Sequence, residues 1–375
     1  MTSPKVSFVV PCYRLAHFLR DCVTSILSQT YEDLEVLILD DCSPDDTAKV
    51  ALSFTDARVR YIKNQVNLGH LKNYNHGIEL AKGKYIWLVS ADDRLRRNYI
   101  LQRYVQVMED HPEVGYACCS AALLLGDRET GIDRSFGDRD VIFEGKQLSR
   151  RLLKEGNCVV AGSGMVRREC YEKLGAFPLD MPYAGDWYLW CLFALHYDVA
   201  YFGEPMVNYR QHESSMTNQL TGERLAVRFK DGLAVLWRIR RHVEELGDDG
   251  MVSLCRDRIA YQYGQNLVGR EVEGTTFRMS KDEFEQSLDN NSHNLQEMDY
   301  IKARTWEIAG DSHTRRRDFD AACACYDLAR KYEPWNPKLW TKQSLVALGL
   351  GSAALTCRDA VFAVRRRVSG LAPNL

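Results

Sequence analysis

Apolar residues in the first hundred positions occur as short continuous runs rather than in alternation with polar ones. Residues 5–11 form a β-branched run that ends with a proline, and residues 34–39 are mostly apolar. Between them, apolar side chains recur at helical spacing over residues 15–29. Strands without alternation that are separated by helices predict a parallel sheet covered on both faces. The expected strands are residues 5–11, 34–39, 59–62 and 85–89, and the expected helices are residues 15–29, 45–54, 73–81 and about 97–109.

The pattern changes along the rest of the chain. Residues 114–119 and 199–202 predict further strands, and residues 186–196 predict an apolar helix. After about Glu223 the strand signal disappears, and the sequence becomes rich in charged and helix-forming residues. We therefore expect an α/β domain followed by an all-α region. The expected boundaries are 1–220 for the α/β domain, 221–300 for a helical extension and 301–375 for a second helical region.

The second helical region contains the spacing of a tetratricopeptide repeat. In that repeat, small residues let two helices pack closely and a proline ends the second helix. Trp340 follows Trp306 by one repeat period of about 34 residues, but the second copy soon loses the pattern. A helical hairpin with chance spacing is the other interpretation. We expect Trp306 and Tyr326 to pack the two helices together, and the matching positions are Trp306, Gly310, Ala322, Tyr326, Ala329 and Pro334.

Composition limits the class of protein. The 375 residues carry a formal net charge of -2, which gives no support for nucleic acid as a partner. The 12 cysteines lack zinc-finger spacing, and no apolar run approaches the length of a membrane-spanning helix. We expect a cytoplasmic protein with reduced thiols. The basic segment 361–367 is either a contact with the inner face of a membrane or a solvated helix end.

Two acidic pairs follow expected strands, Asp40-Asp41 after the second and Asp92-Asp93 after the fourth. Ligands of parallel sheets bind at the carboxyl ends of strands, so these pairs are expected at one edge. Adjacent carboxylates repel each other, and a hard cation that bridges them to a phosphate would relieve the repulsion. The other interpretation is a helix start, with Asp92 or Asp93 as the N-cap. The first interpretation predicts a metal site that holds a nucleoside diphosphate, and the second predicts an ordinary helix cap.

Several ordered segments between Lys5 and Ser215 resemble the family 2 glycosyltransferases. These segments are KVSFVVPCYR, SILSQTYEDLEVLILDDCSPDDT, NLGHLKNYNHGIELAKGKYIWLVSADD, GDWYLW and NYRQHESS. The resemblance implies the GT-A fold, an α/β, Rossmann-like fold with a mostly parallel sheet. It also implies inverting transfer of a sugar from a nucleoside diphosphate donor, with a divalent metal, Mn²⁺ or Mg²⁺, as cofactor.

The resemblance assigns the nucleotide to the first two strands. Pro11 and Tyr13 match the family's first-strand turn, where Tyr13 would lie against the base; the alternative is a surface tyrosine that closes a turn. Asp41 matches the aspartate that recognises the base. A carboxylate accepts from the ring N–H of uracil, thymine or guanine, whereas cytosine has an acceptor there. UDP-sugars are therefore favoured, dTDP- and GDP-sugars remain open, and CMP-sugars are disfavoured.

The resemblance places the diphosphate and metal at the fourth strand. Asp92 matches the metal-binding aspartate of the Asp-x-Asp motif, while Ser90 replaces the first aspartate and Ala91 lies between them. The serine brings no charge, which weakens the expected ribose contact. Arg210 and His212 match a late Arg-x-His element, in which Arg210 would neutralise a phosphate and His212 would bind the metal or a phosphate.

The resemblance assigns the chemistry to Asp186. It matches the catalytic base, and burial beside an apolar helix could raise its pKa toward useful basicity; an N-cap is the alternative role. Gly162 would bring backbone close to the donor sugar, or would form a plain turn. Trp187 and Trp190 could stack on a sugar, with Trp187 the better candidate for acceptor binding, but a core position is the more common reason for such residues.

The sequence does not identify the acceptor of the sugar. A polysaccharide or lipid-linked oligosaccharide is the first choice, and a peptide or protein is the second, since helical repeats commonly bind chains or form homodimers. A catalytically inactive nucleotide-sugar-binding scaffold is the third interpretation. The loss of an aspartate at Ser90 favours it, whereas Asp92 and Asp186 oppose it.

Overall fold

A computed structural model describes residues 3–133, 136–213, 215, 225–272 and 275–351. The chain divides into two compact units, residues 1–220 and 221–375. None of the described helices is both long enough and apolar enough to cross a membrane. The further division expected at residue 300 stays a prediction.

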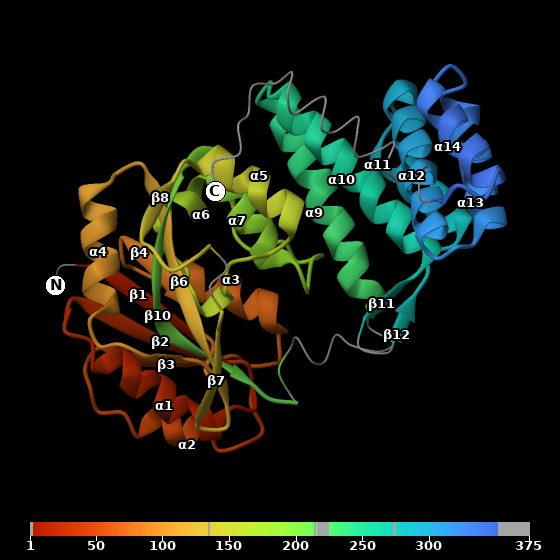
Figure 1. Ribbon diagram of the computed structural model, residues 1–375. Helices are drawn as coiled ribbons and strands as arrows, with labels where there is room; N and C mark the ends of the chain where they lie inside the picture. The colour runs from red at the N-terminus through yellow and green to blue at the C-terminus, as the bar shows by residue number, and fades with distance from the viewer. Residues whose placement is uncertain (1–2, 134–135, 214, 216–224, 273–274, 352–375) are drawn as a thin grey trace. The chain divides into compact units, whose positions relative to one another are not determined.

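The first four strands lie side by side in parallel, as their apolar runs predict (Figure 1). Their order in the sheet is β3-β2-β1-β4, and Cys12 at the end of β1 is paired with Asp40 at the end of β2. The strand ends therefore form one edge, and the acidic pairs begin there. The four strands are β1 (Val6–Cys12), β2 (Leu34–Asp40), β3 (Val59–Lys63) and β4 (Tyr85–Leu88).

The other half of the sheet is mixed. Antiparallel β9 joins β4 to β6, and the long strands β6 and β10 are parallel to each other. Short antiparallel strands then complete a sheet of ten strands within the described residues. The sequence did not predict these short strands, because they are too brief to establish a pattern. The six strands are β5 (Arg94–Leu95), β6 (Val114–Leu125), β7 (Arg128–Asp133), β8 (Val141–Phe143), β9 (Met165–Arg167) and β10 (Asp198–Gln211).

Helices cover both faces of the sheet, as predicted. Helices α1 (Ala16–Leu27) and α4 (Ile100–Asp110) bury their apolar sides in one core with β1 and β4, where Trp87 stacks on Tyr104 at 4.7 Å between ring centroids. On the opposite face, α3 (His70–Leu80) approaches β1 so closely that a Cβ on Gly77 would lie 2.3 Å from Val9. The remaining helices of this unit are α2 (Thr47–Leu52), α5 (Gly145–Glu155), the 3-10 helix η1 (Ala161–Ser163), α6 (Arg168–Leu174) and α7 (Gly185–His196).

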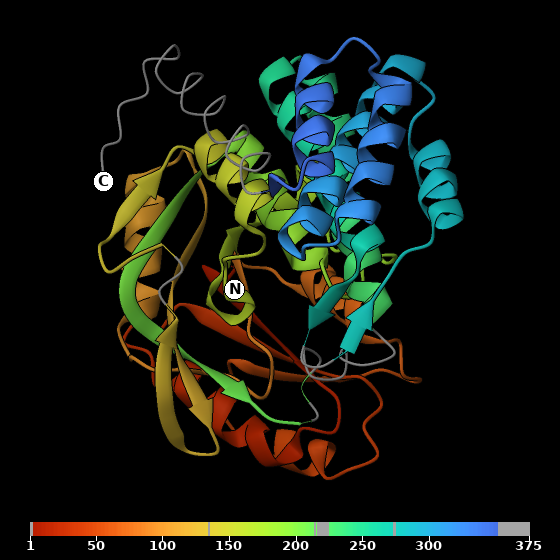
Figure 2. The same cartoon turned by 45° about the vertical axis from the view of Figure 1, so that its right-hand side comes forward.

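In its described residues, the second unit is helical apart from one short hairpin. Strands β11 and β12 pair antiparallel between α10 and α11, which corrects the expectation that no strand follows Glu223. Each strand has three residues, too few to show a period. Helices α12, α13 and α14 lie side by side (Figure 2). The elements are α9 (Leu225–Glu245), α10 (Asp249–Val268), β11 (Arg270–Val272), β12 (Thr275–Phe277), α11 (Lys281–Asn291), α12 (Leu295–Arg315), α13 (Phe319–Tyr332) and α14 (Pro337–Ala347).

Helices α12 and α13 form a tight hairpin at Gly310. A Cβ added to Gly310 would lie 2.7 Å from the ring of Tyr326, whose hydroxyl donates to Asp311 at 2.8 Å. Tyr326 thus packs α13 on α12, as the spacing predicts. The ring of Trp306 instead meets Phe284 of α11, at 6.1 Å between centroids. The tetratricopeptide-like assignment stays a prediction.

A buried lysine links the last described helix to α12. Lys342 of α14 is fully buried, and its Nζ donates to Glu307 at 2.8 Å and to Asp311 at 2.6 Å. Burial opposes ionisation of Glu307, but the cations of Arg304, Lys342 and Lys338 lower its pKa to about 2. This ion cluster fixes α14 on α12.

Candidate active site

A cavity of about 180 Å³ lies at the carboxyl edge of β4. Its walls come from α3, the turn at residues 90–93, η1, the start of α7 and β10. The structure therefore brings together four predicted site residues that are far apart in the sequence. These four residues are Ser90, Asp92, Gly162 and Asp186, and they share the cavity with Asp93, Tyr74 and Trp190.

Asp92 presents one paired and one unpaired carboxylate oxygen. Its Oδ2 lies 2.9 Å from Nε2 of His212, whereas its Oδ1 is buried without a hydrogen-bond partner. Burial opposes ionisation, but hydrogen bonds from His212 and Ser90 outweigh it and lower the pKa of Asp92. Asp92 is thus held as a carboxylate, and one of its two oxygens has no hydrogen-bond partner.

Asp92 and His212 suit a small divalent cation. In the described part of the chain, no cluster of three or more histidine, cysteine or acidic side chains could hold a metal by itself. Mg²⁺ and similar ions, however, commonly take one or two protein carboxylates and complete their shell with substrate phosphates and water. The unpartnered Oδ1 of Asp92 and the adjacent imidazole fit that kind of shared site.

The side chain of Asp93 is held by contacts within the protein. Its Oδ1 accepts from the backbone N–H of Arg210 at 2.9 Å, and a Cβ on Gly162 would lie 2.8 Å from its Oδ2. Burial first, and then the neighbouring charge of Asp92, raise the pKa of Asp93 well above its ordinary value. The absence of a side chain at Gly162 therefore makes room for Asp93.

The side chain of Arg210 is buried, and its guanidinium forms hydrogen bonds with other groups of the protein. Its guanidinium donates to the carbonyl of Asp92 at 2.8 Å, to the carbonyl of Gly126 at 2.6 Å and to Asp21 at 2.9 Å. It also lies over the ring of Phe18, 4.5 Å from the centroid. These contacts fix the backbone of Asp92. They lend no support to the expected phosphate contact.

Asp186 is the second residue of α7, and Ala184 occupies the N-cap, so the alternative role as N-cap is wrong. Its carboxylate accepts from Asn157 at 2.8 Å and from the backbone N–H of Trp187 at 2.7 Å. Burial nevertheless raises its pKa to about 6. Burial and then the charges of Asp92 and Asp186 raise the pKa of Tyr74, so both carboxylates lie near one phenol.

Asp41 is buried at the end of β2 and holds the segment before α3. Its carboxylate accepts from the side chain of Asn64 at 2.9 Å and from the backbone N–H groups of Leu68 and Gly69 at 2.8 and 3.0 Å. No sequence pattern predicts these partners. Neither Asp41 nor Tyr13 lines the cavity.

The first-strand turn connects to the Asp92 turn through the backbone. Pro11 is buried, and its carbonyl accepts from the N–H of Ala91 at 3.2 Å. Tyr13 is 41% exposed and lies under the guanidinium of Arg14. The ring of Tyr13 is therefore accessible to a nucleotide base, whereas Pro11 and Ala91 shape the backbone.

The two tryptophans of α7 have different surroundings. Trp187 is 7% exposed, and its Nε1 donates to the carbonyl of Leu152 in α5 at 3.1 Å, so it belongs to the core between these helices. This position does not support the acceptor contact expected for it. Trp190, one turn later, lines the cavity, and its Nε1 has no partner. The sequence could not separate the two because α7 is apolar on nearly every side.

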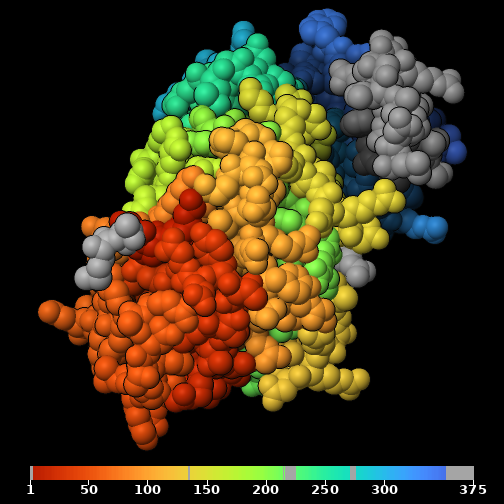
Figure 3. All heavy atoms as spheres, turned by 90° about the vertical axis from the view of Figure 1, so that its left-hand side faces the viewer, coloured from red at the N-terminus to blue at the C-terminus, as the bar shows by residue number. Residues whose placement is uncertain are grey.

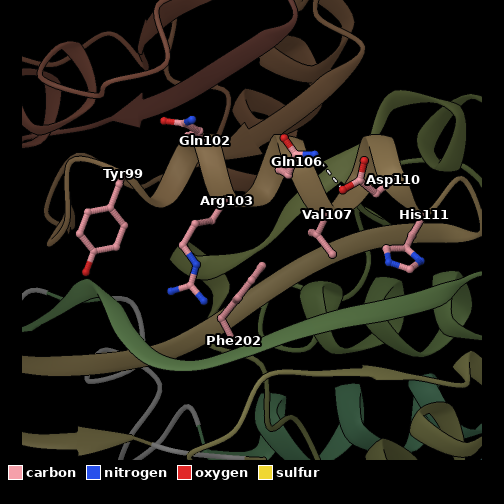
Figure 4. A pocket seen from close by; sticks show the side chains of 8 residues that line it. All are labelled: Tyr99, Gln102, Arg103, Gln106, Val107, Asp110, His111 and Phe202. Carbon is pink, nitrogen blue, oxygen red and sulfur yellow. Dashed lines mark hydrogen bonds between the residues drawn. The ribbon is translucent and has the colours of Figure 1, made fainter.

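A second pocket of about 410 Å³ lies over α4, on the face turned to the viewer in Figure 3. Figure 4 shows its side chains, including Arg103, Phe202 and the hydrogen-bonded pair Gln106 and Asp110. None of the predicted site residues lines it.

Comparison with known proteins identifies the first unit. The family model of glycosyl transferase family 2 matches residues 7–175. The α/β unit belongs to this family. Glycosyltransferase GlyG of Streptococcus pneumoniae is 38% identical over 114 residues, which are 30% of this chain and 38% of that protein. An uncharacterized glycosyltransferase of Rickettsia typhi, RT0329, is 27% identical over 219 residues, 58% of this chain and 67% of that protein.

Solved structures share the fold of this chain. The crystal structure of S. aureus TarS 1–349 in complex with UDP-GlcNAc aligns with a TM-score of 0.59 and 14% identity. The alignment covers 96% of this chain and 92% of that one. The expected GT-A fold, with a mostly parallel sheet, is thereby confirmed, and the C-terminal region is helical apart from the β11–β12 hairpin in its described residues.

Proposed function

We propose that this protein is an inverting glycosyltransferase that moves a sugar from a nucleoside diphosphate donor to a hydroxyl of a polysaccharide or lipid-linked oligosaccharide. One observation carries the proposal. The cavity holds both a carboxylate with an unpartnered buried oxygen, Asp92, and a second carboxylate whose pKa is about 6, Asp186. The first suits a diphosphate with its counter-ion, and the second suits proton abstraction near neutral pH.

Asp186 is proposed as the general base. A base must be ionised to accept a proton, and it is most effective when its pKa lies near the working pH. The bonds from Asn157 and the N–H of Trp187 hold the carboxylate in place. It would accept the proton of the acceptor hydroxyl as that oxygen attacks the anomeric carbon, while the bond to the diphosphate breaks on the opposite face.

Asp92 and His212 are proposed to hold a divalent cation, Mg²⁺ or Mn²⁺. When bound, such an ion supplies positive charge that stabilises a departing diphosphate. Ser90 contributes to the lowered pKa of Asp92, so the residue that replaces the usual aspartate still favours the ionised carboxylate. The main reason for the inactive-scaffold interpretation is therefore weaker than the sequence suggests.

Asp41 is proposed to recognise the base of the donor, with Tyr13 against the base face. A carboxylate offers about four lone-pair sites, and three N–H groups of the protein use three of them. The remaining site can accept the ring N–H of uracil. S. aureus TarS, which shares the fold, is solved with UDP-GlcNAc, and this supports UDP-sugars as the first donors to test.

The experiment is a donor screen with the full chain. UDP-, dTDP-, GDP- and CMP-sugars are incubated with Mn²⁺, and the released nucleotide is measured. We expect release from a UDP-sugar, its loss in Asp186→Asn, and normal release in Asp33→Asn, a surface carboxylate used as control. No release from any donor, or full release by Asp186→Asn, would contradict the proposal.

A further inference from the structure

Few buried side-chain nitrogen or oxygen atoms lack a partner among the described residues, and two of them belong to residues that line the same cavity. One is the acceptor Oδ1 of Asp92, and the other is the donor Nε1 of Trp190. A buried polar group without a hydrogen bond costs about 1–3 kcal/mol, and such groups are rare in folded proteins. The cation proposed for Asp92 leaves the indole N–H unexplained.

The indole of Trp190 is held rigidly. The side chain is 4% exposed, and its ring packs against Tyr116 at 4.9 Å between centroids. A Cβ on Gly164 would lie 2.5 Å from Cη2 of the indole, so only glycine leaves room for the ring there. A donor fixed in this way selects for the position of an acceptor atom.

The same contacts place the indole near the donor side of the cavity. Gly164 packs on Trp190, and Gly162, two residues earlier, packs on Asp93. Asp93 directly follows Asp92, the proposed partner of the diphosphate. The transferred sugar, which is bonded to that diphosphate, is therefore the part of the donor nearest to Trp190.

The walls of the cavity indicate which chemical group the indole would bind. An indole N–H only donates, whereas a sugar hydroxyl needs an acceptor as well as a donor. An amide carbonyl needs only donors, and the methyl group of an acetamide favours apolar surroundings. The cavity offers such surroundings through Leu71, Tyr74, Leu88, Tyr171, Phe177 and Pro182.

We propose that the N–H of Trp190 donates to the carbonyl oxygen of an acylamino group on the transferred sugar, which makes Trp190 a specificity-determining residue for N-acylated donors. This inference rests on the proposed function, because it assumes that the cavity holds a nucleotide sugar. The indole would discriminate between two sugars attached to the same nucleotide, and it would contribute nothing to binding of the nucleotide alone.

The test removes the N–H and keeps the ring. Benzothienylalanine at position 190 has sulfur in place of the N–H and nearly the same shape. Calorimetry with Mn²⁺ gives the affinities for UDP, UDP-glucose and UDP-N-acetylglucosamine. We expect the unmodified protein to prefer UDP-N-acetylglucosamine over UDP-glucose. The variant should lose about 3- to 10-fold of that preference, the usual value of a neutral hydrogen bond, with unchanged UDP affinity.

The same replacement at position 187 is a matched control. Trp187 lies one turn away on the same helix, and its Nε1 is already bonded to Leu152. That variant should be less stable but should keep the sugar preference. Trp190→Phe, which also lacks the N–H, provides a second variant should the first fold poorly.

The outcomes separate the two proposals. An unchanged preference at position 190, or an equal loss of UDP affinity, would overturn the role of Trp190 and leave the proposed function intact. Failure of the unmodified protein to bind any of the three UDP compounds would overturn the UDP donor and, with it, this inference.

Discussion

At the scale of single residues, the raised pKa of Asp186 predicts the pH profile of the reaction. The base acts only when ionised, so transfer should rise with pH through about 6 and level off above it. Asp186→Asn should lower turnover by roughly 10²-fold or more and abolish that rise. Measurement of kcat/KM from pH 4.5 to 8 checks both effects. A rise through pH 6 that persists in the variant would assign it to another group.

The same pKa predicts a change in stability. Ionisation of a carboxyl whose pKa is raised from 3.8 to about 6 in the folded state destabilises that state. The penalty is absent below pH 4, grows between pH 4 and 6 and is complete above 6. At pH 7, the free energy of unfolding of Asp186→Asn should therefore exceed that of the unmodified protein by up to about 3 kcal/mol. The variant should accordingly unfold at a higher urea concentration. An equal gain at pH 4 would show another cause.

Asp92→Ala tests the proposed cation site. The variant removes the carboxylate and leaves His212 as the protein ligand. We expect UDP to lose the part of its affinity that depends on Mn²⁺, while the unfolding temperature changes little. Calorimetry of UDP binding with Mn²⁺ and with a chelator measures this difference. Retention of the Mn²⁺-dependent affinity would place the ion elsewhere.

The sequence predicted the shared position of several candidate residues better than it predicted their contacts. Ser90, Asp92 and Asp186 occupy one cavity because they stand at the ends of strands or at a helix start, positions that a pattern reveals. The role of Arg210 depends on acceptors from three separate segments, and no local pattern contains them. The distinction between Trp187 and Trp190 depends on which side of an apolar helix faces the cavity.

At the scale of elements, continuous apolar runs predicted the buried parallel strands, because such strands need apolar residues on both faces. The exposed strand β7, Arg128–Asp133, contains mainly polar residues and forms by pairing with β6. Its sequence alone gives no reason for a strand. The same holds for the hairpin of β11 and β12, whose strands are very short.

The α12–α13 hairpin makes a prediction at this scale. Ala is a better helix former than Gly, but a Cβ at Gly310 would lie 2.7 Å from the ring of Tyr326. Gly310→Ala should therefore destabilise the helical unit by about 1–3 kcal/mol. In a Tyr326→Leu background the same change should cost less, because the ring is gone. Urea unfolding of the four proteins measures the coupling, and strictly additive effects would contradict the packing.

At the scale of the whole molecule, the proposed donor site belongs entirely to the first unit. UDP with Mn²⁺ should slow backbone hydrogen exchange in the turn at residues 90–93 and at the ends of β1 and β2. It should leave exchange in α12–α14 unchanged. Mass spectrometry of exchanged peptides measures both. Protection within residues 301–347 would show that the helices respond to the donor.

The second unit shows a limit of sequence prediction at this scale. Lysine is almost never fully buried, so a sequence places Lys342 on the surface. Its burial depends on Glu307 and Asp311, which lie in α12, two helices earlier in the chain. Only the assembled bundle brings these charges together.

The inward-facing guanidinium of Arg210 affects what its replacement would reveal. Alanine there would leave two carbonyls and Asp21 without their donor, and the loop that carries Asp92 could then shift. A screen scored on growth or turnover would group Arg210 with residues that touch the sugar nucleotide. Lysine would fail as well, because one ammonium cannot reproduce a planar fork. A loss of activity on replacing Arg210 would therefore reflect its support of the loop that carries Asp92, and it would not identify the donor.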